Sequence, residues 1–277
     1  MHSVLIIGCG DLGGEVASQL VSQSYEVIGV RRSAQKITGV KIIQADVTNA
    51  KTLNELIDIQ PEIIIYCVAA NGQTDENYKA HYVDGFRNIL ATQQKNTKLQ
   101  HVFFVSSTRV YGQKTDALLD EATDAIPADF GGKRLLEAES LLGTIACNST
   151  ILRLSGIYGA GRLRMINLAK SPESWPDQNS WTNRIHRDDA AAFMVFLVIS
   201  LTNKKNILPC YIVTDSASSS QYEVLNWIAA QINAVKPNHM NAIKGGKRLS
   251  NARLLSTGFK LRYPSFKEGY ANLLLNN

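Results

Sequence analysis

The sequence lacks the long apolar run that a membrane-spanning helix needs, and it also lacks a dense basic cluster. Its longest apolar stretch, AAAFMVFLVIS at residues 190–200, is too short to cross a bilayer. The N-terminus has neither a charged region nor an extended apolar core, so we expect no signal peptide. The net charge is only +5, and no segment is more basic than KGGKR at residues 244–248, which argues against a nucleic-acid partner. These absences predict a cytoplasmic protein that binds neither membranes nor nucleic acids.

Cysteine is scarce, and its spacing excludes the usual metal and redox motifs. The four cysteines are Cys9, Cys67, Cys147 and Cys210, and no pair has metal-ligand or CxxC spacing. We therefore expect small buried thiols in a reducing compartment and no metal site. What is present is ordinary: 277 residues, 45% hydrophobic and 19% charged. That composition suits one large globular domain, or one domain with a smaller appendage.

Short β-branched runs alternate with helical patterns through the first half of the chain. The strand candidates are near-continuously apolar, which is typical of strands buried on both faces of a parallel sheet. They cover residues 3–8, 25–30, 40–45, 62–69, 101–106 and 149–155. Alternation of this kind predicts an α/β fold, a Rossmann-type doubly wound parallel sheet.

Beyond residue 156 the alternation loosens. Residues 171–181 are rich in loop formers, and the pattern then predicts a helix at 188–200, a strand at 210–215 and a helix at 221–233. Two short helices separated by a turn are expected at residues 250–275. We predict an NAD(P)-binding Rossmann domain at residues 1–155. Residues 156–277 would form a small, mainly substrate-binding C-terminal region, from which segments at about 185–215 return to the Rossmann core.

A glycine-rich motif lies where the first strand meets the first helix. LIIGCGDLGGEVA carries Gly8, Gly10 and Gly13 in the spacing G-x-G-x-x-G, which in this context indicates dinucleotide binding. Gly8 permits the tight turn, Gly10 lets a pyrophosphate approach the backbone, and Gly13 lets helix and strand pack closely. The free N–H groups at the helix start would face the anion.

The end of the second strand indicates which cofactor is preferred. NAD-binding proteins usually place an acidic residue there to hold the ribose 2′-hydroxyl, whereas this chain has Arg31 and Arg32. A guanidinium can bind a 2′-phosphate through paired hydrogen bonds, so we favour NADP over NAD; the alternative is that the arginines are merely solvated. Asp46 is placed to touch the adenine. Ala69 and Ala70 would let the backbone pass near the pyrophosphate and the nicotinamide ribose.

Four further segments resemble the extended short-chain dehydrogenase/reductases, the NAD(P)-dependent epimerase/dehydratase family. VFFVSSTRVYG resembles the family's fifth-strand motif, LRLSGIYGAGR its R-x-x-x-x-Y-G-P-G segment, NRIHRDDAAA its I-H-V-D-D segment, and NARLLSTGFKLRYPSFKEG its C-terminal signature. The resemblance covers nearly the whole chain and implies the fold and superfamily without specifying a substrate. It implies that Ser107 binds the reacting oxygen.

Three departures from the family pattern bear on the chemistry. Phe130 and Arg134 occupy the places of the usual Tyr-x-x-x-Lys pair, Tyr82 stands where an Asn is usual, and Thr108 and Arg109 follow Ser107 in place of an Asp-Glu pair. This degenerate pattern resembles the atypical YeeZ-like subgroup. Phe130 has no proton to give, although Arg134 can still bind ribose hydroxyls and supply positive charge.

Other residues are candidates for the vacant proton-transfer role and for substrate binding. Tyr111 is the nearest phenol in sequence after Ser107, although the resemblance implies a chiefly structural role for it. His186 could titrate near neutrality or could simply shape a pocket wall. The substrate-binding candidates are Ser107, Tyr158, Arg162, Arg164 and His186, and the arginines suit an anionic group, unless they pair with acidic neighbours.

The sequence motifs and the family resemblance together imply two sets of site residues. The catalytic candidates are Ser107, Arg134 and Tyr111. The expected cofactor-binding residues are Gly8, Gly10, Asp11, Leu12, Gly13, Arg31, Arg32, Asp46, Val47, Ala69, Ala70, Ser106 and Arg134.

Two hypotheses of function remain. The first is an NADP-dependent oxidoreductase or epimerase that acts on a small sugar-like or anionic carbonyl or hydroxyl substrate, as a monomer or homodimer. The alternative is a non-catalytic dinucleotide-binding protein, either a redox sensor or a scaffold.

Overall fold

The computed structural model describes residues 1–235 and 241–275, and within them the central element is a seven-stranded sheet. Its strand order is β11-β7-β5-β4-β1-β2-β3, and the β1–β2, β1–β4, β2–β3 and β4–β5 pairs are parallel. The strands are β1 (Ser3–Ile7), β2 (Glu26–Arg31), β3 (Lys41–Gln44), β4 (Ile63–Tyr66), β5 (His101–Ser107), β7 (Asn148–Leu154) and β11 (Cys210–Val213). This order is that of a Rossmann-type doubly wound sheet, so the predicted fold class is confirmed.

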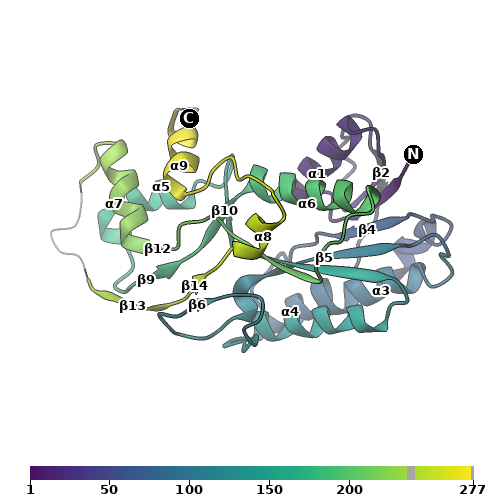
Figure 1. Ribbon diagram of the computed structural model, residues 1–277, viewed down its shortest axis with the longest axis horizontal. Coiled ribbons are helices and arrows are strands. Elements are labelled where there is room, and N and C mark those ends of the chain that lie inside the picture. The colour runs from purple at the N-terminus through teal and green to yellow at the C-terminus, as the bar shows by residue number, and fades with distance from the viewer. Residues whose placement is uncertain (236–240, 276–277) are drawn as a thin grey trace. The chain divides into compact units, whose positions relative to one another are not determined.

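Helices cover both faces of this sheet. In Figure 1, α3 and α4 lie on one face, whereas α1 and α6 lie on the other. The helices of this part are α1 (Asp11–Ser22), α2 (Asp75–Tyr78), α3 (Gly85–Thr92), α4 (Phe130–Ser140) and α6 (Arg187–Thr202). The middle of the sheet is apolar because both of its faces are covered: all four residues of β4 are buried.

The chain divides into two compact units. Unit 1 comprises Met1–Gly112, Ala125–Arg153 and Ala191–Tyr211, and unit 2 comprises Gln113–Asp124, Leu154–Ala190 and Ile212–Asn277. Residues 113–124 thus fall in unit 2, whereas the sequence analysis assigns them to the first domain. The boundary of that insertion is not visible in the sequence pattern, because its only strand, β6 (Leu118–Leu119), has two residues.

Unit 2 is built from short strands and a cluster of helices. Its strands are β6, β8 (Gly156–Tyr158), β9 (Asn179–Thr182), β10 (Arg184–His186), β12 (Ser219–Ser220), β13 (Ile243–Gly246) and β14 (Arg248–Leu249). Its helices are α5 (Arg164–Ala169), α7 (Gln221–Gln231), α8 (Ala252–Ser256) and α9 (Phe266–Leu275). Helices α5, α7 and α9 share one apolar core, to which Trp175 also belongs.

In two segments whose composition suggests a loop, the structure contains strands. The predicted loop at 171–181 ends in β9, and the glycine-containing KGGKR segment at residues 244–248 contributes to β13 and β14. Strand β13 is added beside β9, and a Cβ on Gly246 would lie 2.2 Å from the carbonyl oxygen of Trp181. The two strands therefore approach closely at a glycine, where sequence patterns favour a turn.

Candidate functional site

The loop between β1 and α1 requires glycine at two positions. Gly8 has a φ of +88°, and a Cβ there would lie 2.5 Å from the carbonyl oxygen of Cys67. A Cβ on Gly13 would lie 2.4 Å from the carbonyl oxygen of Gly8. Both distances are far below van der Waals contact, so any residue with a Cβ would clash at these positions. Glycine therefore lets β1, β4 and α1 pack against one another.

The third glycine of the motif has a different environment. A Cβ built on Gly10 would meet nothing within 4 Å, so this glycine is next to open space. Gly10 also precedes α1, whose N-terminus has no side-chain cap. Backbone N–H groups at an uncapped helix start, beside a position with no side chain, can bind an anion such as a pyrophosphate. Leu12, two residues after Gly10, is buried and anchors the start of α1.

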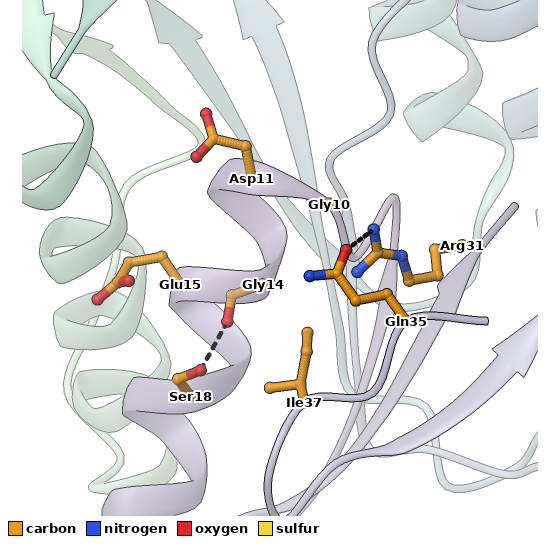
Figure 2. A pocket seen from close by; sticks show the side chains of 8 residues that line it. All are labelled: Gly10, Asp11, Gly14, Glu15, Ser18, Arg31, Gln35 and Ile37. Carbon is orange, nitrogen blue, oxygen red and sulfur yellow. Dashed lines mark hydrogen bonds between the residues drawn. The ribbon is translucent and has the colours of Figure 1, made fainter. Parts of the chain in front are cut away.

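A surface pocket of about 350 Å³ lies beside this loop (Figure 2). It is lined by Gly10, Asp11, Gly14, Glu15, Ser18, Arg31, Gln35 and Ile37. Arg31 donates from Nη2 to Oε1 of Gln35 at 3.0 Å, while its buried Nε has no hydrogen-bond partner among the described residues. Figure 2 shows the carboxylates of Asp11 and Glu15 pointing away from this pair. The pocket therefore places the positive charge of a guanidinium next to the glycine loop, where it could bind a phosphate group.

The other predicted cofactor residues lie at the carboxyl ends of neighbouring strands. Arg32 is exposed just after β2, and Asp46 follows β3 in a turn in which it accepts hydrogen bonds from the N–H and the hydroxyl of Thr48. Partial burial acts to raise the pKa of Asp46, but the Thr48 hydrogen bonds and the Arg32 charge bring it below its ordinary value. Asp46 is therefore ionised at neutral pH.

Val47, Ala69 and Ala70 complete this group. Val47 is buried in the core under the β3 end. Ala69 is exposed and Ala70 half-buried after β4, so a ligand could reach the backbone there without displacing a large side chain.

At the end of β5, Ser106 and Ser107 have separate environments. The buried Ser106 donates to Glu139 at 2.6 Å, and Glu139 pairs with Arg153 at 2.6 Å. Arg153 in turn donates to the hydroxyl of Tyr111 at 2.6 Å. Burial acts to lower the pKa of Arg153, but the Glu139 carboxylate raises it above its ordinary value. Tyr111 has no exposed surface, and its hydroxyl accepts a hydrogen bond from Arg153. Its role as a proton donor stays a prediction.

Ser107 is only half-buried, and its hydroxyl accepts the backbone N–H of Arg109 at 3.2 Å. That contact fixes the oxygen position while leaving the hydroxyl proton free. Such a group could donate to a reacting oxygen, as the sequence analysis expects.

Helix α4 begins at Phe130 and carries Arg134, whose guanidinium makes structural contacts. Asp129 caps α4 by accepting from the N–H of Gly132 at 2.9 Å. Arg134 donates to both carboxylate oxygens of Asp75, at 2.8 and 2.7 Å, and to Glu137 at 2.7 Å. Its guanidinium therefore ties α2 to α4, and a ribose would have to compete with two carboxylates for it. Its role as a ribose ligand stays a prediction.

Sequence reasoning missed a cluster around Phe130. Arg109 lies 5.0 Å from the ring centre of Tyr78 and 5.2 Å from that of Phe130. It also donates to the hydroxyl of Tyr78 at 2.7 Å and through Nε to Asp129 at 3.0 Å. Tyr78 could not be linked to Phe130 from the sequence, because 52 positions separate them and only the packing of α2 on α4 joins them.

In unit 2 the structure brings together two of the predicted substrate residues. The rings of Tyr158 and His186 meet edge to face with centres 5.2 Å apart, and both side chains are buried. Nδ1 of His186 accepts the N–H of Asp188 at 3.2 Å, and burial lowers the pKa of His186. The imidazole is therefore neutral at pH 7. Arg162 and Arg164 are exposed instead, so the four residues do not form one cluster within the unit.

Three predicted absences can be compared with the structure. Within residues 1–235 and 241–275, no group of three acidic, histidine or cysteine side chains could hold a metal ion. All four cysteines are free thiols. No helix in the described ranges is both long and apolar enough to span a membrane.

The sheet order, the glycine loop and the pocket beside it define a dinucleotide-binding protein with a Rossmann fold. The chain belongs to the NAD dependent epimerase/dehydratase family, whose family model matches residues 4–207. The resemblance drawn from the sequence is thereby confirmed, and the chain is placed among NAD-dependent enzymes.

Comparisons with individual proteins agree with this membership. A structure from Methylobacillus flagellatus, named as an NAD-dependent epimerase/dehydratase, is 48% identical, with a TM-score of 0.90 over 99% of this chain and 98% of that chain. Protein YeeZ of Escherichia coli K12 is 24% identical over 95% of this chain and 97% of its own length. The enzyme WbmG of Bordetella bronchiseptica, solved with NAD and UDP, is 16% identical with a TM-score of 0.78, over 98% of this chain and 93% of that one.

Proposed function

We propose that the chain is an NADP-dependent oxidoreductase or epimerase that acts on a small sugar-like or anionic carbonyl or hydroxyl substrate. The observation that carries the cofactor preference is the guanidinium of Arg31, a residue that lines the pocket beside Gly10. A 2′-phosphate is the group that such a donor would bind, because a guanidinium forms strong charge-assisted hydrogen bonds to phosphate. An acidic residue at this position would favour NAD instead.

The residues present fit such a cofactor. The open space at Gly10 and the uncapped start of α1 suit the pyrophosphate. Arg31, with Gln35 beside it, would hold the adenosine ribose end. When bound, the reduced cofactor supplies a hydride.

The protein's own groups would then bind and orient the substrate. Ser107 would donate its hydroxyl proton as a hydrogen bond to the reacting oxygen. Phe130 would present an apolar ring where relatives have a phenol, so it would exclude water but transfer no proton. The substrate class is supported by the family membership and by the UDP bound to WbmG.

A turnover screen tests this proposal. The purified chain is incubated with NADPH or NADP⁺ and with UDP-glucose or UDP-galactose, and with simple anionic ketones. Epimerisation is followed by NMR, and net oxidation or reduction by the absorbance of the reduced cofactor. We expect turnover of at least one probe, and a loss of roughly tenfold or more in Ser107→Ala, since an oxyanion contact typically contributes at least that much.

The screen also separates the two hypotheses. Tight NADPH binding with no turnover of any probe would favour the non-catalytic sensor or scaffold. Absence of cofactor binding would contradict both. Gly143→Ala is a suitable control variant, because Gly143 is exposed and a Cβ there would meet nothing within 4 Å.

A further inference from the structure

The phenol of Tyr78 lies against the residue that replaces the usual proton donor. The rings of Tyr78 and Phe130 meet edge to face, with centres 5.5 Å apart. We propose that Tyr78 is the proton donor and acceptor of this active site, with Arg109 beside it as the stabilising cation. This assignment rests on the proposed function, because it presupposes turnover of a carbonyl or hydroxyl substrate.

The contacts of Arg109 resemble what a catalytic phenol needs from a neighbouring cation. Its Nη1 donates to the Tyr78 hydroxyl at 2.7 Å, and its guanidinium lies over the rings of Tyr78 and Phe130. Asp129 holds the same guanidinium through Nε, with both oxygens at 3.0 Å. A guanidinium that is held in place and donates to a phenol oxygen stabilises the phenolate formed when the proton leaves.

The phenol proton is not committed to a strong internal hydrogen bond. Tyr78 donates to Oε1 of Gln73 at 3.3 Å, which is long for a hydroxyl donor. A substrate oxygen could therefore replace Gln73 as the acceptor of the Tyr78 proton at a small cost in free energy. Tyr78 as a residue is 7% exposed, but the side chain of Arg109 beside it is 31% exposed, so the cluster reaches the surface on the Arg109 side.

The cluster is also attached to the predicted site of the reacting oxygen. The backbone N–H of Arg109 donates to the hydroxyl oxygen of Ser107. Tyr78 ends α2 and is followed directly by a π-helical turn, Lys79–Asp84. Turns of this kind are rare and occur frequently at functional sites, because they re-aim the side chains beside them.

Other phenols of unit 1 are less suited to the role. Burial raises the pKa of Tyr82 to about 12, and the Ala70 N–H hydrogen bond only partly offsets this. The hydroxyl of Tyr66 is buried and donates to the carbonyl of His81. Tyr111 is enclosed with Arg153. Tyr78 alone among these four contacts both Phe130 and a partly exposed cation.

The proposed step is balanced as follows. In reduction, Tyr78 gives its phenolic proton to the carbonyl oxygen as the carbonyl carbon accepts a hydride from NADPH. The C=O π bond, the phenol O–H bond and the C4–H bond of the dihydronicotinamide break, and new C–H and O–H bonds form on the substrate. The substrate is reduced, the cofactor is oxidised to NADP⁺, and the phenolate that remains is hydrogen-bonded to Arg109 until water returns a proton.

The test compares Tyr78→Phe with Tyr25→Phe in the full-length protein, using UDP-glucose and UDP-galactose with NADP⁺ and simple anionic ketones with NADPH. We expect Tyr78→Phe to lower kcat by roughly 10²- to 10⁴-fold, as loss of a general acid does, while NADPH affinity is retained. Tyr25 is the matched control because its hydroxyl also makes a side-chain hydrogen bond, to Thr202 at 2.6 Å. The double variant Tyr78→Phe with Phe130→Tyr should regain part of the activity, because it returns a phenol to the same cluster.

A second readout does not depend on turnover. Binding of NADP⁺ brings a positively charged nicotinamide ring to the site, and contact with it should perturb the ultraviolet absorbance of a neighbouring phenol. The wild type and Tyr25→Phe should show this difference spectrum, and Tyr78→Phe should lose it. If Tyr78→Phe folds poorly, the pair Arg109→Met and Arg109→Lys is compared instead. Only Arg109→Lys, which keeps the positive charge, should retain activity.

Several outcomes would overturn the assignment. Full activity in Tyr78→Phe, or a kcat loss in Tyr82→Phe instead, would refute it while leaving the proposed function intact. A difference spectrum that survives in Tyr78→Phe, or equal activities in Arg109→Met and Arg109→Lys, would also refute it. A wild type that binds NADPH but turns over no probe would contradict the proposed function and this assignment together.

Discussion

At the residue scale, Arg153 neutralises the buried carboxylate behind the end of β5. The side chains of Arg153 and Glu139 are only 10% and 4% exposed. Arg153→Met would leave Glu139 charged and buried without its partner, which typically costs about 3–5 kcal/mol. We expect that loss in the free energy of unfolding, measured by urea denaturation.

A surface ion pair gives the matching control. Arg87 pairs with Asp84 at 2.7 Å, but its side chain is 54% exposed. Arg87→Met should therefore change the free energy of unfolding by less than about 1 kcal/mol. Equal losses in the two variants would show that burial does not set the strength of these pairs.

Asp215 predicts a pH dependence of stability. It is 2% exposed, and burial raises its pKa to about 7, although the charge of Arg184 acts in the opposite direction. In the unfolded chain an aspartate has a pKa of about 3.9. Between these values the folded protein holds a proton that the unfolded chain has lost, so the free energy of unfolding falls as pH rises through this window. The slope from one such group approaches about 1.4 kcal/mol per pH unit, and it ends above the folded pKa.

The measurement is the melting temperature of wild type and Asp215→Asn across that window. We expect the variant to lose most of the decline with rising pH, because its side chain cannot titrate. Asp177→Asn, at an exposed position of the same unit, should keep the wild-type slope. A slope unchanged in Asp215→Asn would refute the assignment of this dependence to Asp215.

At the element scale, the β1–α1 loop separates residues needed for folding from those needed for binding. Gly13→Ala would drive a Cβ into the carbonyl oxygen of Gly8, so we expect a melting temperature several degrees lower. Gly10→Ala meets no protein atom within 4 Å, so it should fold but place a methyl group where the pyrophosphate approaches. NADPH affinity should fall roughly tenfold or more, because a phosphate hydrogen-bonded to the backbone must then move. Thermal denaturation and fluorescence titration check both, and unchanged NADPH affinity in Gly10→Ala would contradict this view of the loop.

The elements of unit 1 could largely be predicted from sequence, and the physical reason is their periodicity. The predicted strand at 101–106 and the observed β5 (His101–Ser107) differ by one residue, because an apolar run bounded by polar residues marks a doubly covered strand. The strands of unit 2 have only two to four residues, too few to show a periodic pattern of apolar residues in the sequence. Strand β13 was missed because its Lys-Gly-Gly sequence resembles a turn, and only its pairing with β9 makes it a strand.

The same distinction applies to the candidate site. The glycine loop and Arg31 could be predicted because they lie in one short stretch of sequence with fixed spacing. The Tyr78–Arg109–Phe130 cluster could not, because it joins α2, the end of β5 and the start of α4. Nor could the sequence show that the guanidinium of Arg134 is hydrogen-bonded to Asp75, since 59 positions separate the two residues.

At the scale of the whole molecule, cofactor binding should be visible as stabilisation. A ligand that binds only the folded state adds about 2.7 kcal/mol at a concentration of 100 times Kd. For a chain of this length that corresponds to a rise in melting temperature of roughly 5–10 °C. We expect this rise with NADPH in the wild type and a much smaller one in Arg31→Glu. Equal rises in the two proteins would show that Arg31 does not contact the cofactor.

The most direct test of the account is an equilibrium titration of the purified protein with NADPH and with NADH, followed by nicotinamide fluorescence. The guanidinium of Arg31, which lines the pocket, should bind the 2′-phosphate that only NADPH carries. A charge-assisted hydrogen bond contributes about 1.5–3 kcal/mol, so the predicted result is a Kd for NADPH roughly 10- to 100-fold below that for NADH. Equal affinities, or tighter binding of NADH, would contradict the account.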